Sequence, residues 1–393
     1  MQLVERHIIV NDPELEAICG KAKRLYNQAL YYLRQATFGK IEKFKEYELS
    51  GLFAEFKEEN YKSLPAQTSQ QVIKLLFKNY KSWYKARKEW QKNPAKFTGR
   101  PKLPRYKKET SIVVFTDQQV NLKDGFVHFP KNTISPVKTK VDNVCQVRIV
   151  PSATCFIIEI VYNKTPEINE NLNENNILSI DLGLNNIATC INNVGKQPII
   201  INGKVLKSVN QMYNKTKAKL MSYVGDRGSS NRINKLTLYR NCYIEDKLHK
   251  ISRYIVDYCI VNNIGTIVIG HNKGWKDEIN IGRSNNQKFC SLPHSRLIDK
   301  IRYKSELCGI KVIEHEESHT SKIDHLALEE LKHQEVYLGK RKKRGLFQSS
   351  IGKLINADVN GAIGIARKVF GNSVVKQIVD SGLAFNPVRI SIF

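Results

Sequence analysis

The sequence of 393 residues is too long for one ordinary hydrophobic core and long enough for two or three domains. Hydrophobic residues make up 41% of it, which argues against a largely disordered chain. Lysine and arginine number 63 against 37 aspartate and glutamate, which gives a formal net charge of +26. This excess is typical of a protein that binds nucleic acid; the simpler alternative is a basic protein without a polyanionic partner.

Three features indicate an intracellular protein. No apolar run reaches the roughly 18 residues that a membrane-spanning helix needs, and the first residues, MQLVERHIIV, lack the pattern of a secretory signal. The eight cysteines are scattered from Cys19 to Cys308 without a C-x-x-C pair, as expected for reduced thiols. We therefore expect a cytoplasmic protein that does not enter the membrane.

The N-terminal part of the chain combines one strand with a helical region. Residues 4–10 (VERHIIV) have the alternation of a strand, and from 13 to about 57 apolar residues recur at helical spacing. The stretch 64–90 continues this pattern and adds aromatic residues, Tyr80 and Trp83 among them. We expect a helical hairpin or bundle. Its aromatic stripe is either part of the core, which is the simpler interpretation, or a surface for base stacking.

A basic segment follows these helices. Residues 85–108 carry ten lysines and arginines and one acid, Glu89. Prolines and a glycine in FTGRPKLPRYKK prevent a continuous helix, so we expect an extended segment that either tracks phosphates or forms a solvated loop. Its candidate nucleic-acid contacts are Arg100, Lys102 and Arg105. Short strand patterns then continue to residue 163, with a hairpin turn at KDG, and predict a β module into which the helices are inserted.

From Ile177 onward the chain alternates strands and helices, which is typical of an α/β domain. The polar stretch 163–176 is typical of a linker that precedes such a domain. The patterns predict a strand, a turn and a second strand over 176–193, and further strands at 264–270 and 310–318. They predict helices over 209–263, interrupted by a Gly/Ser-rich turn near 225–230, and over 293–309 and 355–370.

Two acids of this domain are candidates for a functional site. Asp181 ends an apolar strand (ILSID), where an isolated charge is costly. Asp358 lies in the first turn of a helix (INADVNGAIGIARK), where the helix dipole favours a carboxylate, and Gly361 and Ala362 allow that helix to pack close to a sheet. Two such acids supply the oxygen ligands that Mg²⁺ prefers, and a pair of ions about 4 Å apart can cleave a phosphodiester. The alternative is a strand-end cap and an ordinary helix acid.

These motifs carry a family resemblance. ILSIDLGLNNIAT, TIVIG, EESHTSK and INADVNGAIGIARK resemble, in this order, the nuclease domain of TnpB proteins, transposon-encoded RNA-guided DNA endonucleases related to the type V CRISPR effectors. LYNQALYYLRQ, LPAQTSQQV and GRPKLPRYK are similar to the N-terminal half of the same family, so the resemblance covers nearly the whole chain. It implies a multidomain α/β fold with a β-barrel wedge module (1–10 and 100–165), a helical recognition insertion (11–99) and an RNase H-like (RuvC) nuclease domain (175–320 and 350–393).

The resemblance also implies partners and chemistry. It implies a guide RNA, from a transposon end or a CRISPR array, and a double-stranded DNA target with a short adjacent motif. R-loop formation and cleavage with two Mg²⁺ ions would follow. It places the protein in the cytoplasm of a prokaryotic cell, associated with the nucleoid. We expect a monomer on each guide RNA, with a dimer as the alternative.

One departure from the family concerns zinc. Its members usually carry a four-cysteine zinc ribbon after TSK, where this sequence has Ile323 and no cysteine beyond Cys308. We expect no zinc, because the nearby histidines lack the spacing of a zinc site; they are His315, His319, His325 and His333. Residues 321–349 are instead expected to form a basic loop. Its candidate phosphate contacts are Lys340, Arg341, Lys342, Lys343 and Arg344.

The other departure concerns the third acid of the site. The family usually has a Glu at the end of the strand TIVIG, where this sequence has Gly270. If the strands at 177–181, 264–270 and 310–318 are parallel neighbours, Glu316 and Glu317 lie beside Gly270 at the ends of these strands, and a Glu can reach across the ~4.8 Å between strands. Because successive side chains point to opposite faces, we expect one of them, Glu317, to replace the missing acid, with Glu316 as the reserve. The alternative is that both are solvated.

The resemblance thus implies an RNA-guided DNA endonuclease, and the residues favour Asp181, Glu317 and Asp358 as its catalytic and Mg²⁺-binding acids. The competing hypothesis is a cleavage-dead relative that binds guide RNA and DNA and acts as a repressor. Gly270 and the lost ribbon favour this second hypothesis. The first is favoured by the retention of two acids, whose mutual repulsion would be costly without a metal.

Overall fold

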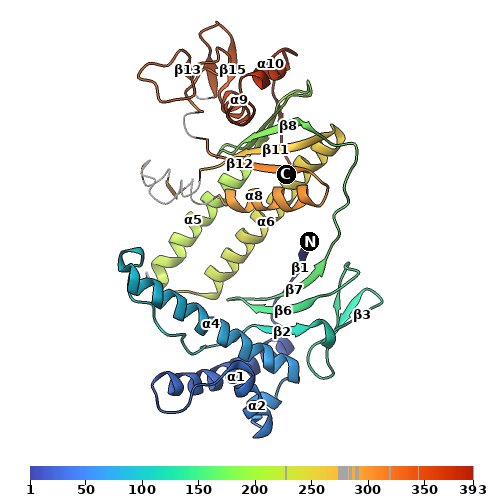
Figure 1. The fold of residues 1–393 in the computed structure, drawn as a ribbon, viewed down its shortest axis with the longest axis vertical. Coiled ribbons are helices and arrows are strands. Elements are labelled where there is room, and N and C mark those ends of the chain that lie inside the picture. Colours follow the sequence, from blue (N-terminus) through green and yellow to red (C-terminus); the bar gives the residue numbers. More distant parts are fainter. Residues whose placement is uncertain are drawn as a thin grey trace. The chain divides into compact units, whose positions relative to one another are not determined.

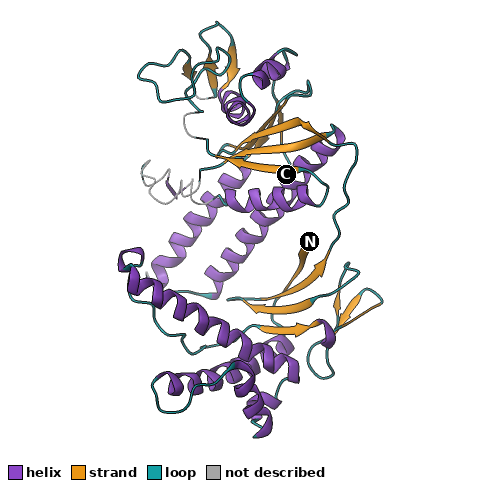
Figure 2. Ribbon diagram, viewed as in Figure 1, coloured by secondary structure: helices purple, strands orange, loops and turns teal. Residues whose placement is uncertain are grey.

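A computed structural model describes residues 1–225, 228–272, 282, 286–287, 292–317, 320–343 and 345–392 of the chain. The chain divides into two compact units, Met1–Lys164 and Thr165–Phe393, hereafter the N-terminal and C-terminal units. Figure 1 labels many of the helices and strands of both units, and Figure 2 colours the elements by type. Among the described helices, none is both long and apolar enough to cross a membrane.

Helices occupy the first half of the N-terminal unit. The first of them begins at a strong cap, because the Asp12 side chain accepts a hydrogen bond from Leu15 N at 3.0 Å and Pro13 takes the first helical position. The helices confirm the helical region that the sequence predicts. They are α1 (Pro13–Thr37), α2 (Glu46–Glu55), α3 (Glu59–Lys62), α4 (Ala66–Lys92), and the short 3-10 helices η1 (Pro94–Lys96) and η2 (Asp117–Gln119).

The strands of the N-terminal unit form two antiparallel sheets. In the larger one the order is β1-β7-β6-β2, and β1 pairs with β7 along its whole length, from Gln2 opposite Asn163 to Ile9 opposite Phe156. The chain thus leaves this sheet after β1, builds the helices and returns to it at β2. The closed barrel stays a prediction. The strands are β1 (Gln2–Ile9), β2 (Val113–Thr116), β6 (Gln146–Pro151) and β7 (Phe156–Asn163), and in the smaller sheet β3 (Asn121–Lys123), β4 (Phe126–His128) and β5 (Val137–Lys138).

A six-stranded mixed sheet forms the centre of the C-terminal unit, in the order β12-β11-β8-β9-β10-β16. Strands β8, β11 and β12 are parallel neighbours, as the sequence predicts, and β9 runs antiparallel to β8 and β10. The carboxyl ends of the three parallel strands therefore meet at one edge. The strands are β8 (Asn173–Asp181), β9 (Asn186–Asn192), β10 (Ile199–Asn202), β11 (Ile264–Gly270), β12 (Lys311–His315) and β16 (Val388–Ile390).

Helices cover both faces of this sheet (Figure 1). Along β8, Leu178 and Ile180 pack into the core beneath α6 and α8, while Ile177 belongs to the core beneath α9. Ser179 lies on the α9 face, since its Oγ donates a hydrogen bond to the carbonyl of Ala362 at 2.8 Å. The alternation of a strand thus directs every second residue of β8 toward α9. The helices are α5 (Lys204–Val224), α6 (Asn231–Val261), α8 (His294–Glu306), α9 (Ala357–Phe370), α10 (Ser373–Val379) and η3 (Leu383–Phe385).

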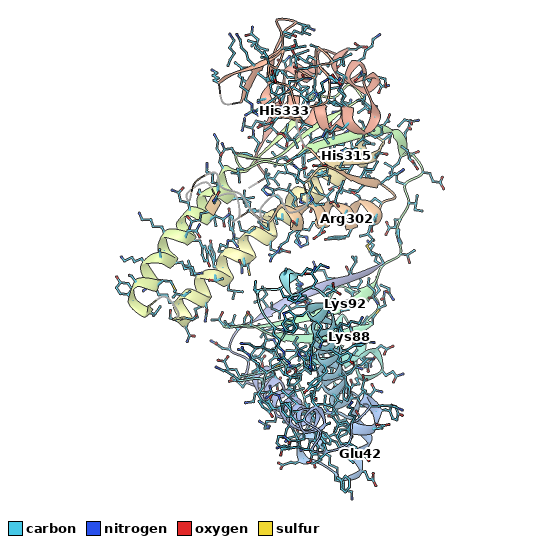
Figure 3. All side chains as sticks on the ribbon, turned by 60° about the vertical axis from the view of Figure 1, so that its left-hand side comes forward. Glu42, Lys88, Lys92, Arg302, His315 and His333 are labelled. Carbon is cyan, nitrogen blue, oxygen red and sulfur yellow. The ribbon has the colours of Figure 1, made fainter. Side chains whose placement is uncertain are left out.

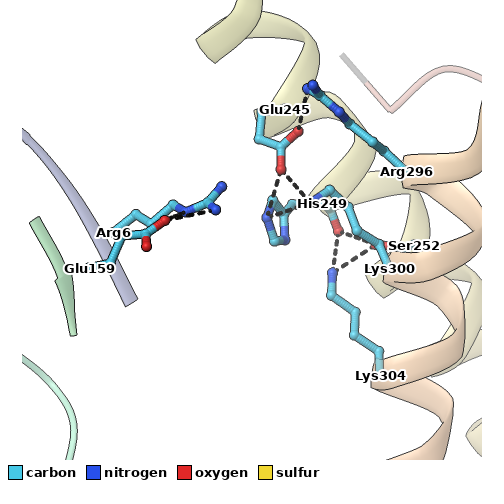
Figure 4. Close-up of polar contacts among 8 residues, drawn as sticks. All are labelled: Arg6, Glu159, Glu245, His249, Ser252, Arg296, Lys300 and Lys304. Carbon is cyan, nitrogen blue, oxygen red and sulfur yellow. Dashed lines mark hydrogen bonds and ion pairs between the residues drawn. The ribbon is translucent and has the colours of Figure 1, made fainter. Parts of the chain in front are cut away.

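Polar contacts join α6 to α8 (Figure 4). Glu245 of α6 forms ion pairs with Arg296 and Lys300 of α8. One helical turn further along α8, Lys304 donates hydrogen bonds to the carbonyl of His249 and to Ser252 Oγ. Burial lowers the pKa of Lys304 to about 8. The two helices are therefore held in register on their face of the sheet.

The segment expected to be a basic loop contains strands that the sequence analysis does not predict. Asp324 is fully buried and accepts hydrogen bonds from Ser349 Oγ and from the backbone and side chain of Ser350. Arg367 of α9 donates to the carbonyls of Leu328 and Glu329. The buried carboxylate thus ties the two ends of this segment together, and the arginine attaches the segment to α9. Its small sheet contains β13 (Lys340–Lys343), β14 (Leu346–Gln348) and β15 (Leu354–Asn356).

Candidate active site

Asp181 is the last residue of β8 and shares the face of Ile177 and Ser179, so its carboxylate faces α9. A Cβ built at Gly361 of α9 would lie 2.9 Å from Asp181 Oδ2. The glycine therefore leaves room for the carboxylate against the helix backbone, as the pattern of small residues in this helix predicts. Any larger residue at 361 would push the helix or the acid away.

Asp358 approaches the same region from the first turn of α9. The Asn356 side chain caps this helix by accepting hydrogen bonds from the backbone N–H groups of Asp358 and Val359. The Asp358 carboxylate accepts a hydrogen bond at 2.5 Å from Nδ2 of Asn186, the first residue of β9. Asn186 in turn accepts from Arg389 through its Oδ1. The acid is thus oriented by groups from two strands of the sheet.

Glu317 follows the end of β12 and reaches the neighbouring strand β11. Its backbone N–H donates to Oδ1 of Asn272, just beyond the end of β11, at 2.8 Å. A Cβ built at Gly270, the last residue of β11, would lie 2.8 Å from Glu317 Oε2 and would overlap the side chain of Ile365 on α9. The carboxylate of Glu317 therefore occupies the space beside Gly270 that a side chain at position 270 would need.

Glu316 has different surroundings. Glu316 is exposed, whereas Glu317 is partly buried, and burial raises the pKa of the Glu317 carboxyl. The backbone carbonyl of Glu316 accepts a hydrogen bond from Nζ of Lys368 on α9. Of the two adjacent acids, Glu317 is the one beside Gly270; its role in chemistry stays a prediction.

The three acids Asp181, Glu317 and Asp358, hereafter the acid cluster, interact electrostatically. Burial, and next the negative charges of Glu317 and Asp358, raise the pKa of Asp181 to about 8. Arg341 of β13 opposes this shift, so its guanidinium lies near enough to Asp181 to act as a counter-charge. A raised pKa of this origin marks a place where a cation would relieve repulsion between carboxylates.

The donor set of the acid cluster suits a hard divalent ion, because Mg²⁺ takes carboxylate oxygens. In the described part of the chain, no three His, Cys, Asp or Glu side chains already converge into a ligand shell. Binding an ion would therefore draw the three carboxylates together. The observation that supports such an ion is the raised pKa of Asp181, which reflects repulsion from Glu317 and Asp358. The ion itself remains a proposal.

The predicted nucleic-acid contacts lie in separate places. Arg100, Lys102 and Arg105 belong to the N-terminal unit, after η1, where the Arg100 guanidinium lies 5.8 Å from the ring centroid of Trp90. In the C-terminal unit, β13 consists of the exposed residues Lys340, Arg341, Lys342 and Lys343. Arg344 lies outside the described residues. The role of both groups with nucleic acid stays a prediction.

The histidines near the acid cluster have local partners. His315 ends β12 (Figure 3), and its Nδ1 lies 2.9 Å from the carbonyl of Glu316. His325 is buried with Nε2 2.9 Å from the carbonyl of Thr320, and burial lowers its pKa to about 4. Such a histidine is neutral at physiological pH and packs against α9 as part of the core. His319 lies outside the described residues.

Sequence reasoning missed the asparagines that hold the acid cluster. Asn186 contacts Asp358, and Asn272 contacts Glu317. Both lie in polar turns immediately after or before apolar strands (LGLNN and IGHN), which is the one signal that could have found them. An amide that contacts a carboxylate fixes its direction, so these residues bear on the geometry of the site.

Two family models match separate parts of the chain. The model OrfB_IS605, described as a probable transposase, matches residues 159–276, and the Cas12f1-like TNB domain model matches residues 294–365. The first match includes β8 with Asp181, and the second includes the part of α9 up to residue 365, with Asp358. No curated protein matches the chain.

Solved structures also resemble the chain. The cryo-EM structure of a Cas12f1-sgRNA-target DNA complex matches with a TM-score of 0.51 and 16% identity over 90% of this chain and 81% of that one. A CRISPR-Cas12f ternary complex matches with a TM-score of 0.38 and 15% identity over 90% of this chain and 80% of that one. The mini-RNA-guided endonuclease CRISPR-Cas_phi3 matches with a TM-score of 0.41 and 11% identity over 95% of this chain and 92% of that one. At 16% identity the first likeness shows a shared fold and nothing finer.

Proposed function

We propose that this chain, which belongs to the TnpB-like family, is an RNA-guided DNA endonuclease that cleaves DNA at the acid cluster. It would bind a guide RNA, read a short motif beside its target, open the duplex into an R-loop and hydrolyse phosphodiester bonds. The observation that carries the proposal is the position of Glu317, whose Oε2 lies 2.8 Å from the Cβ that a residue at 270 would have.

This position supplies the acid that Gly270 lacks. Because β11 and β12 are parallel neighbours, His315 lies opposite Gly270, and the chain beyond β12 runs past the end of β11. Two residues after His315, Glu317 is again on the α9 face, where Asp181 is also directed. The third carboxylate would therefore be present at the site, delivered from the next strand.

The residues of the acid cluster would hold two Mg²⁺ ions, which activate water and stabilise the leaving oxygen in phosphodiester cleavage. Asp181 would be the central ligand, since both other acids raise its pKa. Asn186 and Asn272 would orient Asp358 and Glu317. Arg341, close enough to Asp181 to influence its pKa, would contact the phosphate of the substrate and balance its charge.

The rest of the chain would bind the nucleic acids. We assign residues 1–10 and 100–165 to a wedge module, 11–99 to a recognition insertion, and 175–320 with 350–393 to an RNase H-like nuclease domain. Segment 321–349, with β13 exposed, would contact target DNA. The net charge of +26 supports polyanionic partners. A monomer on each guide RNA remains our expectation.

Gly270 favours a second candidate function, a cleavage-dead repressor of the same family. Gly270 has no side chain, whereas the family usually has a Glu at the end of this strand. The two functions differ in one outcome, because a repressor would bind guide RNA and target DNA without cutting. A protein–RNA complex incubated with a target plasmid and Mg²⁺ separates them: cleavage that EDTA abolishes identifies the enzyme.

A set of variants tests the role of Glu317. Replacing a group that hydrogen-bonds to a metal ligand typically lowers activity by about 10- to 100-fold. Removing a ligand itself should cost more, so Asp181→Ala, Glu317→Ala and Asp358→Ala should each reduce the cleavage rate by more than about 100-fold. Glu316→Ala is the matched control and should cleave normally. Normal cleavage by Glu317→Ala would refute the relocated acid.

A combined variant tests the position directly. Gly270→Glu together with Glu317→Ala returns the acid to β11 and empties the space that it needs. Because Cδ1 and Cγ1 of Ile365 also lie too close to a Cβ at position 270, Ile365→Ala is added to make room. Recovery of cleavage relative to Glu317→Ala alone would show that positions 270 and 317 serve the same site.

A further inference from the structure

Helix α4 has two different halves. Its buried residues, among them Val72 and Leu76, all lie in the first half, and from Phe77 to the end no residue is buried. The second half nevertheless carries Trp83 and Tyr84, and Figure 3 shows Lys88 and Lys92 on the same stretch. Phe77 and Tyr80 still pack against the core as partly buried residues, but beyond them the helix stays rich in aromatic and basic residues, and such a surface calls for a partner.

This half of α4 lines a groove made of two adjoining cavities. The larger has a volume of about 830 Å³ and lies between α4, the end of α1 and the start of α2; the smaller, of about 420 Å³, extends to residues 100–103. Thr37, Trp83 and Arg87 line both cavities. Trp83 Nε1 donates a hydrogen bond to the carbonyl of Pro101 at 3.3 Å, which fixes the basic segment along the groove.

The chemistry of the groove combines rings with positive charge. Among the described residues that line the larger cavity, Glu46 is the one acid, against five lysines and arginines. Phe38 at the smaller cavity is 62% exposed and Tyr84 at the larger is 54% exposed, so a ligand can reach both rings, and Lys88 Nζ lies 5.2 Å from the ring centroid of Tyr84. The Arg87 guanidinium lies 5.6 Å from the ring centroid of Trp83. The cations of the larger cavity are Lys43, Lys74, Lys78, Lys81 and Arg87.

We propose that this aromatic groove binds unpaired nucleotides of a single-stranded nucleic acid. Rings on which bases stack, beside cations that follow the phosphates, are the elements of single-strand recognition. A duplex would leave the rings unused, because its bases are stacked on one another. An apolar peptide would leave the five cations without partners. The inference rests on the proposed function, since an RNA-guided protein handles both an RNA with unpaired segments and a displaced DNA strand.

The test measures the affinity of the full-length protein for a labelled single-stranded oligonucleotide and for the duplex of the same sequence. Tyr84→Ala removes an exposed ring, Tyr84→Phe keeps it, and Phe56→Ala removes a ring of similar exposure, 68%, that lies outside the groove. Tyr84→Ala should weaken single-strand binding by about 5- to 100-fold, the loss of roughly one stacked base, and duplex binding by less than about twofold. Tyr84→Phe and Phe56→Ala should bind as the wild type does.

An equal loss for single strand and duplex would overturn the proposal, since it would indicate general electrostatic binding. No loss for either would do the same. A shift from dimer to monomer in Tyr84→Ala, with unchanged affinity, would identify a second copy of the chain as the occupant and overturn it too. RNA and DNA versions of the oligonucleotide distinguish the two sources: Tyr84-dependent preference for RNA points to the guide, and preference for DNA to the displaced strand.

The same measurements in an Asp181→Ala background separate this inference from the nuclease proposal. Binding to the groove should not depend on the acid cluster. If the wild type never cleaves DNA, and Tyr84→Ala binds single strands more weakly than the wild type, the nuclease proposal is refuted and the groove proposal is supported. Cleavage that persists while Tyr84→Ala binds both probes normally would refute the groove alone.

Discussion

Replacing Asp181 by asparagine should stabilise the metal-free protein at alkaline pH. The pKa of this acid rises from 3.8 to about 8 because of burial and the charges of Glu317 and Asp358. A difference of about four pKa units corresponds to at most about 6 kcal/mol. Asp181 retains partial exposure, and solvent screens its charge, so we expect about 2–3 kcal/mol. The asparagine keeps the shape of the side chain and cannot acquire the charge.

The sign follows from proton linkage. The pKa of Asp181 is higher in the folded chain than in the unfolded one, so its favourable contribution is fully present below pH 3.8 and is lost as the pH rises to about 8. Asp181→Asn has no such loss. The difference in free energy of unfolding between variant and wild type should therefore grow from near zero at acidic pH to its full value above pH 8.

Urea titrations at about pH 5 and about pH 8.5, read by pulse proteolysis of the C-terminal unit, measure this difference. Mg²⁺ should stabilise the wild type at the higher pH and leave Asp181→Asn unaffected, because the ion relieves the same repulsion. Asp299→Asn is the control, since that acid is exposed and paired with Arg302 (labelled in Figure 3). Equal stability of Asp181→Asn and wild type at both pH values would refute the electrostatic account of the site.

Three further predictions concern the C-terminal unit. Asp324→Ala should lower the free energy of unfolding by about 3 kcal/mol or more in urea titrations, because Ser349 and Ser350 would lose a buried charged hydrogen-bond acceptor. Stability equal to that of the wild type would contradict this. Gly364→Ala should cost about 1–3 kcal/mol, since a Cβ there overlaps the His325 ring, and a variant with unchanged thermal stability would show that the ring can move away. The free energy of unfolding of the wild type relative to Lys304→Met should rise between pH 8 and 10.5, because the pKa of Lys304 is lowered to about 8 in the folded chain; parallel pH profiles of the two proteins would disprove the assignment.

The geometry around Gly270 could be predicted because it depends on simple periodicities. Parallel strands end at one edge, and side chains alternate between faces, so Asp181 and one of two adjacent glutamates had to lie near the end of β11. Glu317 is that residue, with its carboxylate beside Gly270. What the periodicity could not supply is the orientation of the acids, which depends on amides from turns such as Asn186.

The segment 321–349 could not be predicted in the same way. Its sequence is basic and has no apolar period, which favours a loop. Its order comes from contacts distant in sequence: Asp324 with Ser349, and Arg367 with the carbonyl of Leu328. Buried hydrogen bonds to single charged groups leave no periodic signal. Likewise, nothing in the residue spacing of α4 distinguishes its buried half from the half that lines the aromatic groove. The difference appears only in the structure, where Leu76 is the last buried residue of this helix.

Gly270 and Glu317 are best understood as one feature of the site. The space at the end of β11 is bounded by Ile365 of α9, and it holds the carboxylate of Glu317. A side chain at position 270 would displace that carboxylate, and a second acid beside Asp181 would add repulsion to a group whose pKa is already raised. A side chain at position 270 and the observed position of the Glu317 carboxylate are therefore incompatible. If Glu317 serves as the third carboxylate, as we propose, Gly270 leaves it the space it occupies, and the missing acid at the end of β11 does not by itself indicate lost activity.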